Sequence, residues 1–351
     1  MNTAAHALAA RRFPRLPGLL LTAAIAALSL WLGTLPWLQA HGISALTLAI
    51  VTGIAIGNTV YPLLAPRAAA GVGFSKAMLL RAGIILYGLR LTAQDIGQVG
   101  SAGVLIDALV LCSTFALAWW LGSRVLGLER DTALLIGAGS SICGAAAVMA
   151  AEPVVKGRAE QVAVAVATVV VFGTVSMFLY PLLYRWGVSI GWMPLDATGF
   201  GVFTGSTVHE VAQVVAAGRA ISQPVADAAV ITKMVRVMML APFLLGLSAL
   251  LARGGRAGDG QRSKIAVPWF AFGFIAMAGF NSLHLLPAPL VGALVDLDTA
   301  LLAMAMAALG LTTHASALRQ AGARPMLLAL LLFGWLLGGG LLINLGVRAL
   351  L

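Results

Sequence analysis

Residues 199–218 read GFGVFTGSTVHEVAQVVAAG, an apolar stretch of membrane-span length that nevertheless contains ionisable groups. Five polar side chains lie within it: Ser206, Thr207, His209, Glu210 and Gln213. On a helix, all of these except Thr207 share one face. Ionisable groups inside a membrane helix cost about 2.5–3.5 kcal/mol each on insertion scales, and they tend to face a bundle interior or a wet cavity. The stretch is therefore the first candidate for a substrate or ion site.

The composition is that of a membrane protein. Of 351 residues, 60% are hydrophobic and 10% are charged, whereas soluble chains contain about 45–50% apolar and about 25% charged residues. The net charge of +10 does not indicate nucleic-acid binding, because the arginines lie between apolar segments rather than on one basic face. Cys112 and Cys143 fall inside apolar segments and form neither a disulfide framework nor a metal cluster.

Apolar segments divide the whole chain. A helical span needs about 20 mostly apolar residues, and eleven segments qualify: 17–36, 43–62, 77–92, 102–122, 132–151, 161–183, 197–217, 228–251, 266–283, 297–315 and 326–347. The first follows Arg11, Arg12 and Arg15 and is long for a signal peptide, so we expect an uncleaved anchor. The sequence thus predicts an all-α polytopic membrane protein of about eleven transmembrane helices.

Positive charges predict the orientation of these spans. With the N-terminus in the cytoplasm, most lysines and arginines fall in inner loops, and the C-terminus lies outside. Residues 253–264, RGGRAGDGQRSK, form the expected flexible inner linker.

This topology makes a direct prediction. Single cysteines introduced near Arg256 and near Gly292 should react with a membrane-impermeant thiol reagent from opposite sides of the membrane. Labelling of both positions from the outside would contradict the eleven-span arrangement.

Short internal matches suggest a duplication. Residues 53–60 resemble 201–208, residues 75–89 resemble 232–247, and residues 139–141 resemble 310–313, in the same order. Each repeat places a cationic pair on its second helix: Lys76 and Arg81, then Lys233 and Arg236. Since five spans is an odd number, the second copy would enter from the opposite side, giving an inverted repeat. The expected divisions are an anchor helix at 1–38, a first repeat at 39–187 and a second at 188–351.

Two spans have the composition of interrupted helices. Ser140, Ser141 and Cys143 lie among glycines in span 5, and Thr312 and Thr313 follow Gly310 at the matching place in span 10. Interrupted spans at corresponding places in two halves indicate a transporter site, where half-helix N-termini attract anions. Close helix packing by small residues is the alternative. For the pairs Gly53/Gly57 and Gly201/Gly205, packing is the favoured interpretation.

Charged residues inside spans allow several roles. Lys233 and Arg236 share a helix face and could bind an anion, or Arg236 could form a structural ion pair with Glu210 or Asp107. Asp107 could instead carry a proton. His209 and Glu210 could exchange protons or simply hydrogen-bond between helices. His209-Glu210 begins like a zinc-protease HExxH motif, but Gln213 replaces the second histidine. No catalytic base has a recognisable motif with Ser140 or Ser141.

Three stretches together resemble one family. They are GSSICGAAAVMAAEPVV at 139–155, GFGVFTGSTVHEVAQVVAAG at 199–218, and the segment from Lys233 and Arg236 to Leu240-Ala-Pro242. They resemble the YeiH-like bacterial inner-membrane proteins, which are named as sulfate exporters, and the match runs from span 2 to Leu351. Wider resemblance is to the clan of cation:proton antiporters and anion transporters. It implies inverted five-helix repeats, a core domain with two crossing broken helices, and a second domain used for dimerisation. The exporter name is itself a prediction for most members.

The expected function is secondary transport of a small anion, such as sulfate or an organic sulfonate, coupled to H⁺ or Na⁺. Cation:proton antiport through His209, Glu210 and Asp107 is the second transporter hypothesis. A channel and an intramembrane enzyme are further alternatives, and ATP-driven transport would need another subunit because no nucleotide-binding motif is present. We expect a homodimer in the bacterial inner membrane, with no cofactor, no metal and no nucleic-acid partner.

Overall fold

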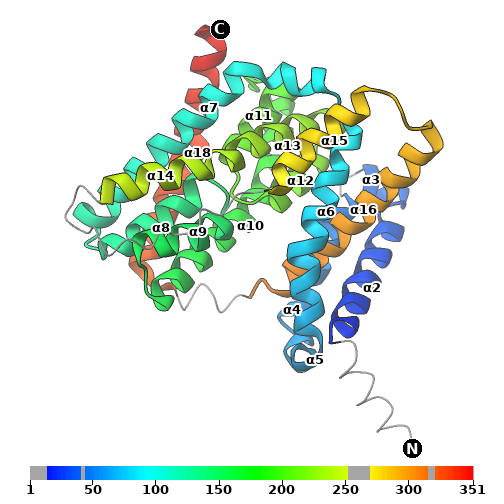
Figure 1. Ribbon diagram of the computed structural model, residues 1–351, viewed down its shortest axis with the longest axis horizontal. Coiled ribbons are helices and arrows are strands. Elements are labelled where there is room, and N and C mark those ends of the chain that lie inside the picture. Colours follow the sequence, from blue (N-terminus) through cyan, green and yellow to red (C-terminus); the bar gives the residue numbers. More distant parts are fainter. Residues whose placement is uncertain (1–13, 41–43, 252–268, 315–320, 351) are drawn as a thin grey trace, which may run out of the picture. The chain divides into compact units, whose positions relative to one another are not determined.

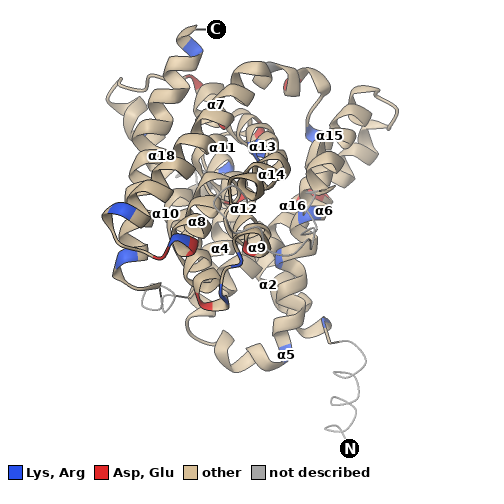
Figure 2. Ribbon diagram, turned by 60° about the vertical axis from the view of Figure 1, so that its left-hand side comes forward, with Lys and Arg blue, Asp and Glu red and all other residues tan. Residues whose placement is uncertain are grey.

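The computed structural model describes residues 14–40, 44–251, 269–314 and 321–350. All regular elements in these ranges are helices (Figure 1). Contacts divide the chain into two compact units, one of residues 1–93 and 272–315 and the other of residues 94–271 and 316–351. Arg11, Arg12 and the expected linker 253–264 lie outside the described residues. Most residues of the helices are uncharged (Figure 2).

The first unit is built on glycine-mediated helix contacts. Its elements are α2 (Leu16–Leu32), α3 (Pro36–Ala40), α4 (Ala45–Gly57), α5 (Tyr61–Phe74), η1 (Ser75–Leu79), α6 (Leu80–Tyr87), η2 (Gly88–Arg90), most of α15 (Trp269–Ser282) and α16 (Ala288–Leu311). A Cβ atom on Gly53 would lie 2.5 Å from the Ala307 carbonyl oxygen, and one on Gly57 would lie 2.7 Å from that of Leu311. The predicted packing role of this glycine pair is therefore confirmed.

The second unit contains α7 (Ala93–Trp120), η3 (Leu121–Val125), α8 (Arg130–Ser141), α9 (Ala145–Val155), α10 (Ala159–Ser189), α11 (Ala197–Thr207), α12 (Val211–Arg219), α13 (Gln223–Met238), α14 (Leu240–Leu251) and α18 (Ala323–Leu350). Helix α11 lies against α13, since Cβ atoms on Gly201 and Gly205 would lie 2.6 and 2.3 Å from carbonyl oxygens of α13. The packing role predicted for this pair is also confirmed.

Asp196 fixes the beginning of α11. As its N-cap, the Asp196 carboxylate accepts hydrogen bonds from the Gly199 amide at 3.0 Å and from Arg348 of α18 at 2.6 Å. The hydrogen bond from Arg348 is the main cause of a pKa below the ordinary value for this carboxyl. The cap thereby orients the half-helix that leads into the polar core of the unit.

Six described helices or continuous helical runs are long and apolar enough to cross a membrane: Tyr61–Arg90, Val99–Val125, Ala159–Ser189, Gln223–Leu251, Ala288–Leu311 and Ala323–Leu350. Shorter apolar helices are Leu16–Leu32, Ala45–Gly57, Ala145–Val155 and Trp269–Ser282. The expected start of the third span at 77 is wrong, because the helix begins at Tyr61 and includes Arg67 and Lys76, which had been assigned to a loop. Its first part packs on α2, where Gly71 lies against Gly18.

The two compact units do not follow the expected sequential division. The first unit combines an early and a late part of the chain, whereas the predicted repeats are consecutive. A duplication can be distributed over such units, so the inverted repeat and the count of eleven spans stay predictions.

Candidate substrate site at the interrupted helices

The interruption predicted in span 5 is present. Helix α8 ends at Ser141, and α9 begins at Ala145. Gly144 between them has φ +70° and ψ −136°, a combination that side-chain-bearing residues rarely adopt. A Cβ atom on Gly144 would lie 2.5 Å from Cγ of Glu210. The glycine thus serves both the sharp turn and the close approach of Glu210.

A second interruption divides the stretch 199–218. Helix α11 ends at Thr207 and α12 begins at Val211, with Val208 and Glu210 in extended backbone conformations. The interpretation of this stretch as a continuous helix with one polar face is therefore wrong. Ser206 belongs to the first half-helix, and Gln213 to the second. In the connecting segment, hydrogen bonds with side chains replace the helical ones: Lys233 donates to the Val208 carbonyl, and Gln213 accepts from the Glu210 backbone N–H.

The helix of span 10 ends at the place where the sequence predicted an interruption. Residues 315–320, which follow it, lie outside the described residues, so a second half-helix there stays a prediction. Helix α16 runs continuously from Ala288 to Leu311, and Thr312 is its C-cap. Gly310, in the last turn of this helix, also serves packing, because a Cβ atom there would lie 2.3 Å from the Ile50 carbonyl oxygen of α4. Thr312 Oγ1 accepts a hydrogen bond from Lys76 at 3.2 Å, and the Thr313 carbonyl accepts one from Asn58 at 2.9 Å. Both threonines belong to the first unit, whereas Ser140 and Ser141 belong to the second.

Two cations of α13 cap the C-terminal ends of the half-helices. Lys233 Nζ donates to the carbonyl oxygens of Ile142 at 2.8 Å and Val208 at 2.6 Å. Arg236 donates from Nε to Ser141 O at 2.8 Å and from one terminal nitrogen to Ser140 O at 2.9 Å. Its other terminal nitrogen donates to the Ser206 carbonyl.

These contacts give the two buried cations a structural role. The last carbonyls of a helix lack intrahelical partners and carry the negative end of its dipole. Lys233 and Arg236, both fully buried, satisfy five such carbonyls at the ends of α8 and α11. The direct partner of Arg236 is thus neither Glu210 nor Asp107, although Asp107 interacts with it electrostatically. Anion binding by these two side chains stays a prediction.

A single carboxylate serves the N-terminal ends of the other two half-helices. Glu210 is the N-cap of α12, where its side chain accepts a hydrogen bond from the backbone N–H of Gln213. In return, Oε1 of the Gln213 side chain accepts one from the backbone N–H of Glu210 at 3.0 Å. The same carboxylate accepts from the Ala145 amide of α9 at 3.4 Å. Amide groups and helix dipoles at both N-terminal ends therefore favour one negative charge here.

Several buried polar atoms around these ends have no hydrogen-bond partner among the described residues. They are both carboxylate oxygens of Asp107, Nδ1 of His209 and Nε2 of Gln213. All three side chains are almost completely buried. Buried polar groups are normally paired because an unpaired one costs about 1–3 kcal/mol. Such a cluster is typical of a site that exchanges ions or hydrogen-bonds a ligand.

Two residues that sequence reasoning missed hold the polar end of α11. Tyr180 of α10 donates to Thr207 Oγ1 at 2.7 Å, and Asn344 of α18 donates to Ser206 Oγ at 3.2 Å. Asn344 could have been recognised as the lone amide in an otherwise apolar span. Tyr180 carries no such signal, because tyrosines are common near membrane interfaces. Cys143 is buried at the other interruption.

An apolar cavity of about 480 Å³ also lies in the second unit, lined by α7, by Met239 and by α14. Phe115, Phe243 and Cys112 are among its lining residues. Its walls offer almost no polar atoms, so they suit hydrocarbon rather than an anion.

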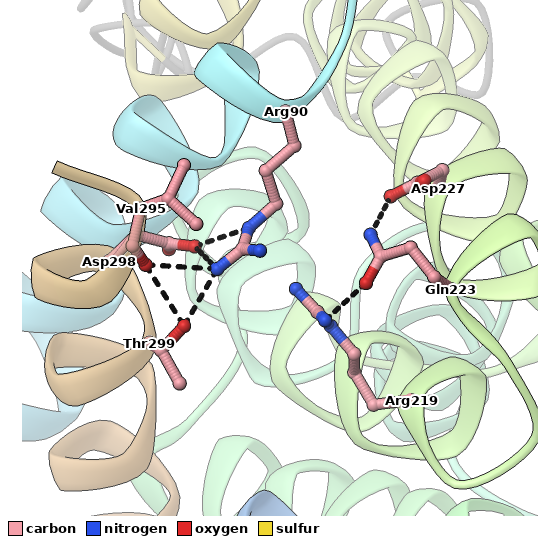
Figure 3. A network of polar contacts seen from close by, with 7 residues as sticks. All are labelled: Arg90, Arg219, Gln223, Asp227, Val295, Asp298 and Thr299. Carbon is pink, nitrogen blue, oxygen red and sulfur yellow. Dashed lines mark hydrogen bonds and ion pairs between the residues drawn. The ribbon is translucent and has the colours of Figure 1, made fainter. Parts of the chain in front are cut away.

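The first unit has a polar network of its own (Figure 3). Arg90 donates from Nε to Asp298 at 2.8 Å and from a terminal nitrogen to the Val295 carbonyl and Thr299. Asp298 is fully buried. The contacts join the helical run that ends at Arg90 to α16. Figure 3 also draws a separate chain of polar contacts at the α12–α13 connection of the second unit, formed by Arg219, Gln223 and Asp227.

Fold and site together define a polytopic helical membrane protein with two interrupted helices around a buried polar centre. The chain belongs to the family described as Conserved hypothetical protein 698, whose model matches residues 17–329. The resemblance to YeiH-like proteins is thereby confirmed.

Curated relatives match over nearly their whole length. A UPF0324 membrane protein of Pseudomonas aeruginosa is 65% identical over 335 residues, which cover 95% of this chain and 94% of the relative. The UPF0324 inner membrane protein YeiH of Escherichia coli is 57% identical over 336 residues, which cover 96% of this chain and 95% of the relative. A UPF0324 membrane protein of Yersinia pestis is 60% identical over 336 residues, 95% of this chain and 93% of the relative. No solved structure matches the chain.

Proposed function

We propose that the protein is a secondary active transporter of a small anion, such as sulfate or an organic sulfonate, coupled to H⁺ or Na⁺. The supporting observation is the meeting of two half-helix N-terminal ends at one carboxylate, Glu210, inside a membrane protein. Broken helices with N-terminal ends directed at an anionic group are the arrangement that secondary transporters use for substrates. The protein acts as a transporter rather than an enzyme and needs no cofactor.

The proposal includes a location and an assembly. The name of the Escherichia coli relative places that protein in the inner membrane, and the same location suits this chain. The distribution of positive charge favours a cytoplasmic N-terminus and an external C-terminus. A homodimer is proposed from the family resemblance alone.

Uptake by proteoliposomes tests the function. Purified full-length protein should accumulate radiolabelled sulfate or methanesulfonate when an inward H⁺ or Na⁺ gradient is imposed, and accumulation should stop when the gradient is collapsed. Liposomes without protein and proteoliposomes without a gradient are the controls. Equal uptake with and without a gradient would indicate a channel, and no uptake of any anion tested would contradict anion transport.

Cation:proton antiport remains the second candidate. It is favoured by Asp107, a fully buried carboxylate without a hydrogen-bond partner among the described residues. Together with His209 and Glu210, Asp107 could carry a cation in one direction and protons in the other. In the same proteoliposomes, Na⁺ or K⁺ addition would then release trapped protons without any anion substrate, which the anion transporter would not do.

A further inference from the structure

We propose that the Glu210 carboxylate is a tethered anion that holds the place of the substrate at the N-terminal ends of α9 and α12. Substrate enters this place when Glu210 takes up a proton and withdraws, so that one proton accompanies each substrate molecule of single charge. The inference rests on the anion transport proposed above and specifies its site and coupling ion.

The geometry at the N-terminal ends is that of an occupied anion site. Helices α9 and α12 have 11 and 9 residues, long enough for their first amides to act together with a helix dipole. The backbone N–H groups of Ala145 in α9 and of Gln213 in α12 both donate to the Glu210 carboxylate. Sulfate and sulfonate oxygens are acceptors of the same kind, so they suit the same donors. Glu210 is also partly exposed, unlike His209 beside it, so a proton and an anion can reach it.

Gln213, at the same end of α12, carries a buried donor that an oxyanion could satisfy. Its Oε1 atom accepts from the Glu210 amide at 3.0 Å, which fixes the orientation of the side-chain amide. Its Nε2 donor is fully buried and has no acceptor within the described residues. Gly173 of α10 leaves room for this amide, since a Cβ atom there would lie 2.2 Å from Oε1. An oxyanion replacing the carboxylate at the same helix end would supply the missing acceptor.

The cationic groups around Glu210 favour H⁺ over Na⁺ as the coupling ion. Half-helix C-terminal carbonyls are where transporters commonly coordinate Na⁺. Here the carbonyls of Ile142 and Val208 already accept from Lys233, and those of three serines accept from Arg236. Lys233 of α13 and Cys143 near the first interruption also interact electrostatically with Glu210. Asp107 of α7 faces the same two cations, and His209 adjoins Glu210.

The exchange keeps the charge of the site constant. A proton from water converts the Glu210 carboxylate to a neutral acid, which releases the amides of α9 and α12. A singly charged anion then takes the released hydrogen bonds, so the site carries one negative charge before and after. A divalent anion such as sulfate brings one negative charge more than the carboxylate that it replaces.

Anion binding measured against pH tests this exchange. Purified full-length protein is titrated with sodium methanesulfonate and with sodium sulfate between about pH 5 and about pH 8, and binding is followed by thermal stabilisation. The variants are Glu210→Gln, which imitates the protonated acid, and Glu160→Gln, which removes an exposed carboxylate at the start of α10. Methanesulfonate affinity of the wild type and of Glu160→Gln should rise up to about tenfold per pH unit of acidification, where one proton is bound. Glu210→Gln should bind methanesulfonate with the same affinity at every pH in this range.

Other outcomes overturn the inference. If Glu210→Gln binds with the pH dependence of the wild type, Glu210 is not the competing anion, while anion transport itself stands. If a folded Glu210→Gln protein binds neither anion, the carboxylate is only a helix cap. Should this variant fail to fold, Glu210→Asp keeps the charge on a shorter arm and should bind methanesulfonate more tightly than the wild type at neutral pH; unchanged affinity overturns the inference. If the variants bind anions as expected but proteoliposomes take up none, the transport function is overturned, while the anion site at Glu210 stands.

Discussion

Replacement of Arg236 by glutamine is expected to lower the free energy of unfolding by about 3 kcal/mol. Arg236 is fully buried and donates to the carbonyls of Ser140, Ser141 and Ser206. Glutamine is shorter and cannot reach all three, and each buried carbonyl left without a donor costs about 1–3 kcal/mol. Sequence reasoning left open whether Arg236 binds an anion or serves the fold, and these contacts favour a role in the fold.

Unfolding in detergent by heat or denaturant measures this effect. Arg185→Gln is the matched control, because Arg185 of the same unit is exposed and donates to the Ala220 carbonyl at the surface. Its expected change is below about 1 kcal/mol. If Arg236→Gln proves as stable as the wild type but no longer gains stability from sulfate or methanesulfonate, the cation binds the anion and its capping role is refuted.

Substitution of Gly144 by alanine should be comparably harmful, with an expected loss of about 2–4 kcal/mol. Its φ of +70° with ψ −136° is a conformation that costs a side-chain-bearing residue about 1–3 kcal/mol. The new methyl group would also lie 2.5 Å from Cγ of Glu210 and displace that side chain. Displacement of this carboxylate should also change the affinity for anions, because Glu210 occupies the helix ends at which the anion is proposed to bind.

Gly346→Ala of α18 is the control for this substitution. Nothing lies within 4 Å of a Cβ atom at Gly346, so alanine should be tolerated in the helix. Equal unfolding midpoints and equal anion binding for Gly144→Ala and the wild type would show that the turn at the first interruption is not under the constraint described above.

The positions of the helices could be predicted well because length and apolar content determine them. The last helix was expected at 326–347 and is Ala323–Leu350. The part of the helical run that begins at Tyr61 was missed because Pro66 and Arg67 make it look like a loop. Its packing against α2 through Gly71 and Gly18 depends on tertiary contact, which a local pattern cannot report.

The interruptions show where sequence reasoning stops. Gly144 made the first one predictable, whereas the segment 208–210 consists of residues that helices accommodate. The break at 208–210 depends on Lys233, 25 residues further along the chain, which donates a hydrogen bond to the Val208 carbonyl. A usable local signal existed in Glu210 and Gln213, whose spacing is that of an N-terminal capping box. Gly310 lies in the last turn of α16 and also packs on α4, because glycine serves helix ends and helix packing alike.

Sequence reasoning singled out most of the residues that meet at the half-helix ends, but not the contacts that they make there. The structure brings Ser140, Ser141, Glu210, Lys233 and Arg236 to the ends of four half-helices. The serines contribute backbone carbonyls to the cations rather than hydroxyl groups, which depends on how the half-helices end. That assignment of cations to C-terminal ends and of the carboxylate to N-terminal ends required coordinates.

Locating a bound selenate ion, a sulfate analogue with an anomalous X-ray signal, tests the central claim most directly. In crystals of the full-length Glu210→Gln protein, we expect an anomalous peak within hydrogen-bond distance of the Ala145 amide and Gln213 Nε2. In the wild type, the same peak should appear only at acidic pH. Selenate bound against Lys233 and Arg236 instead, with the N-terminal ends of α9 and α12 still occupied by residue 210, would contradict the account.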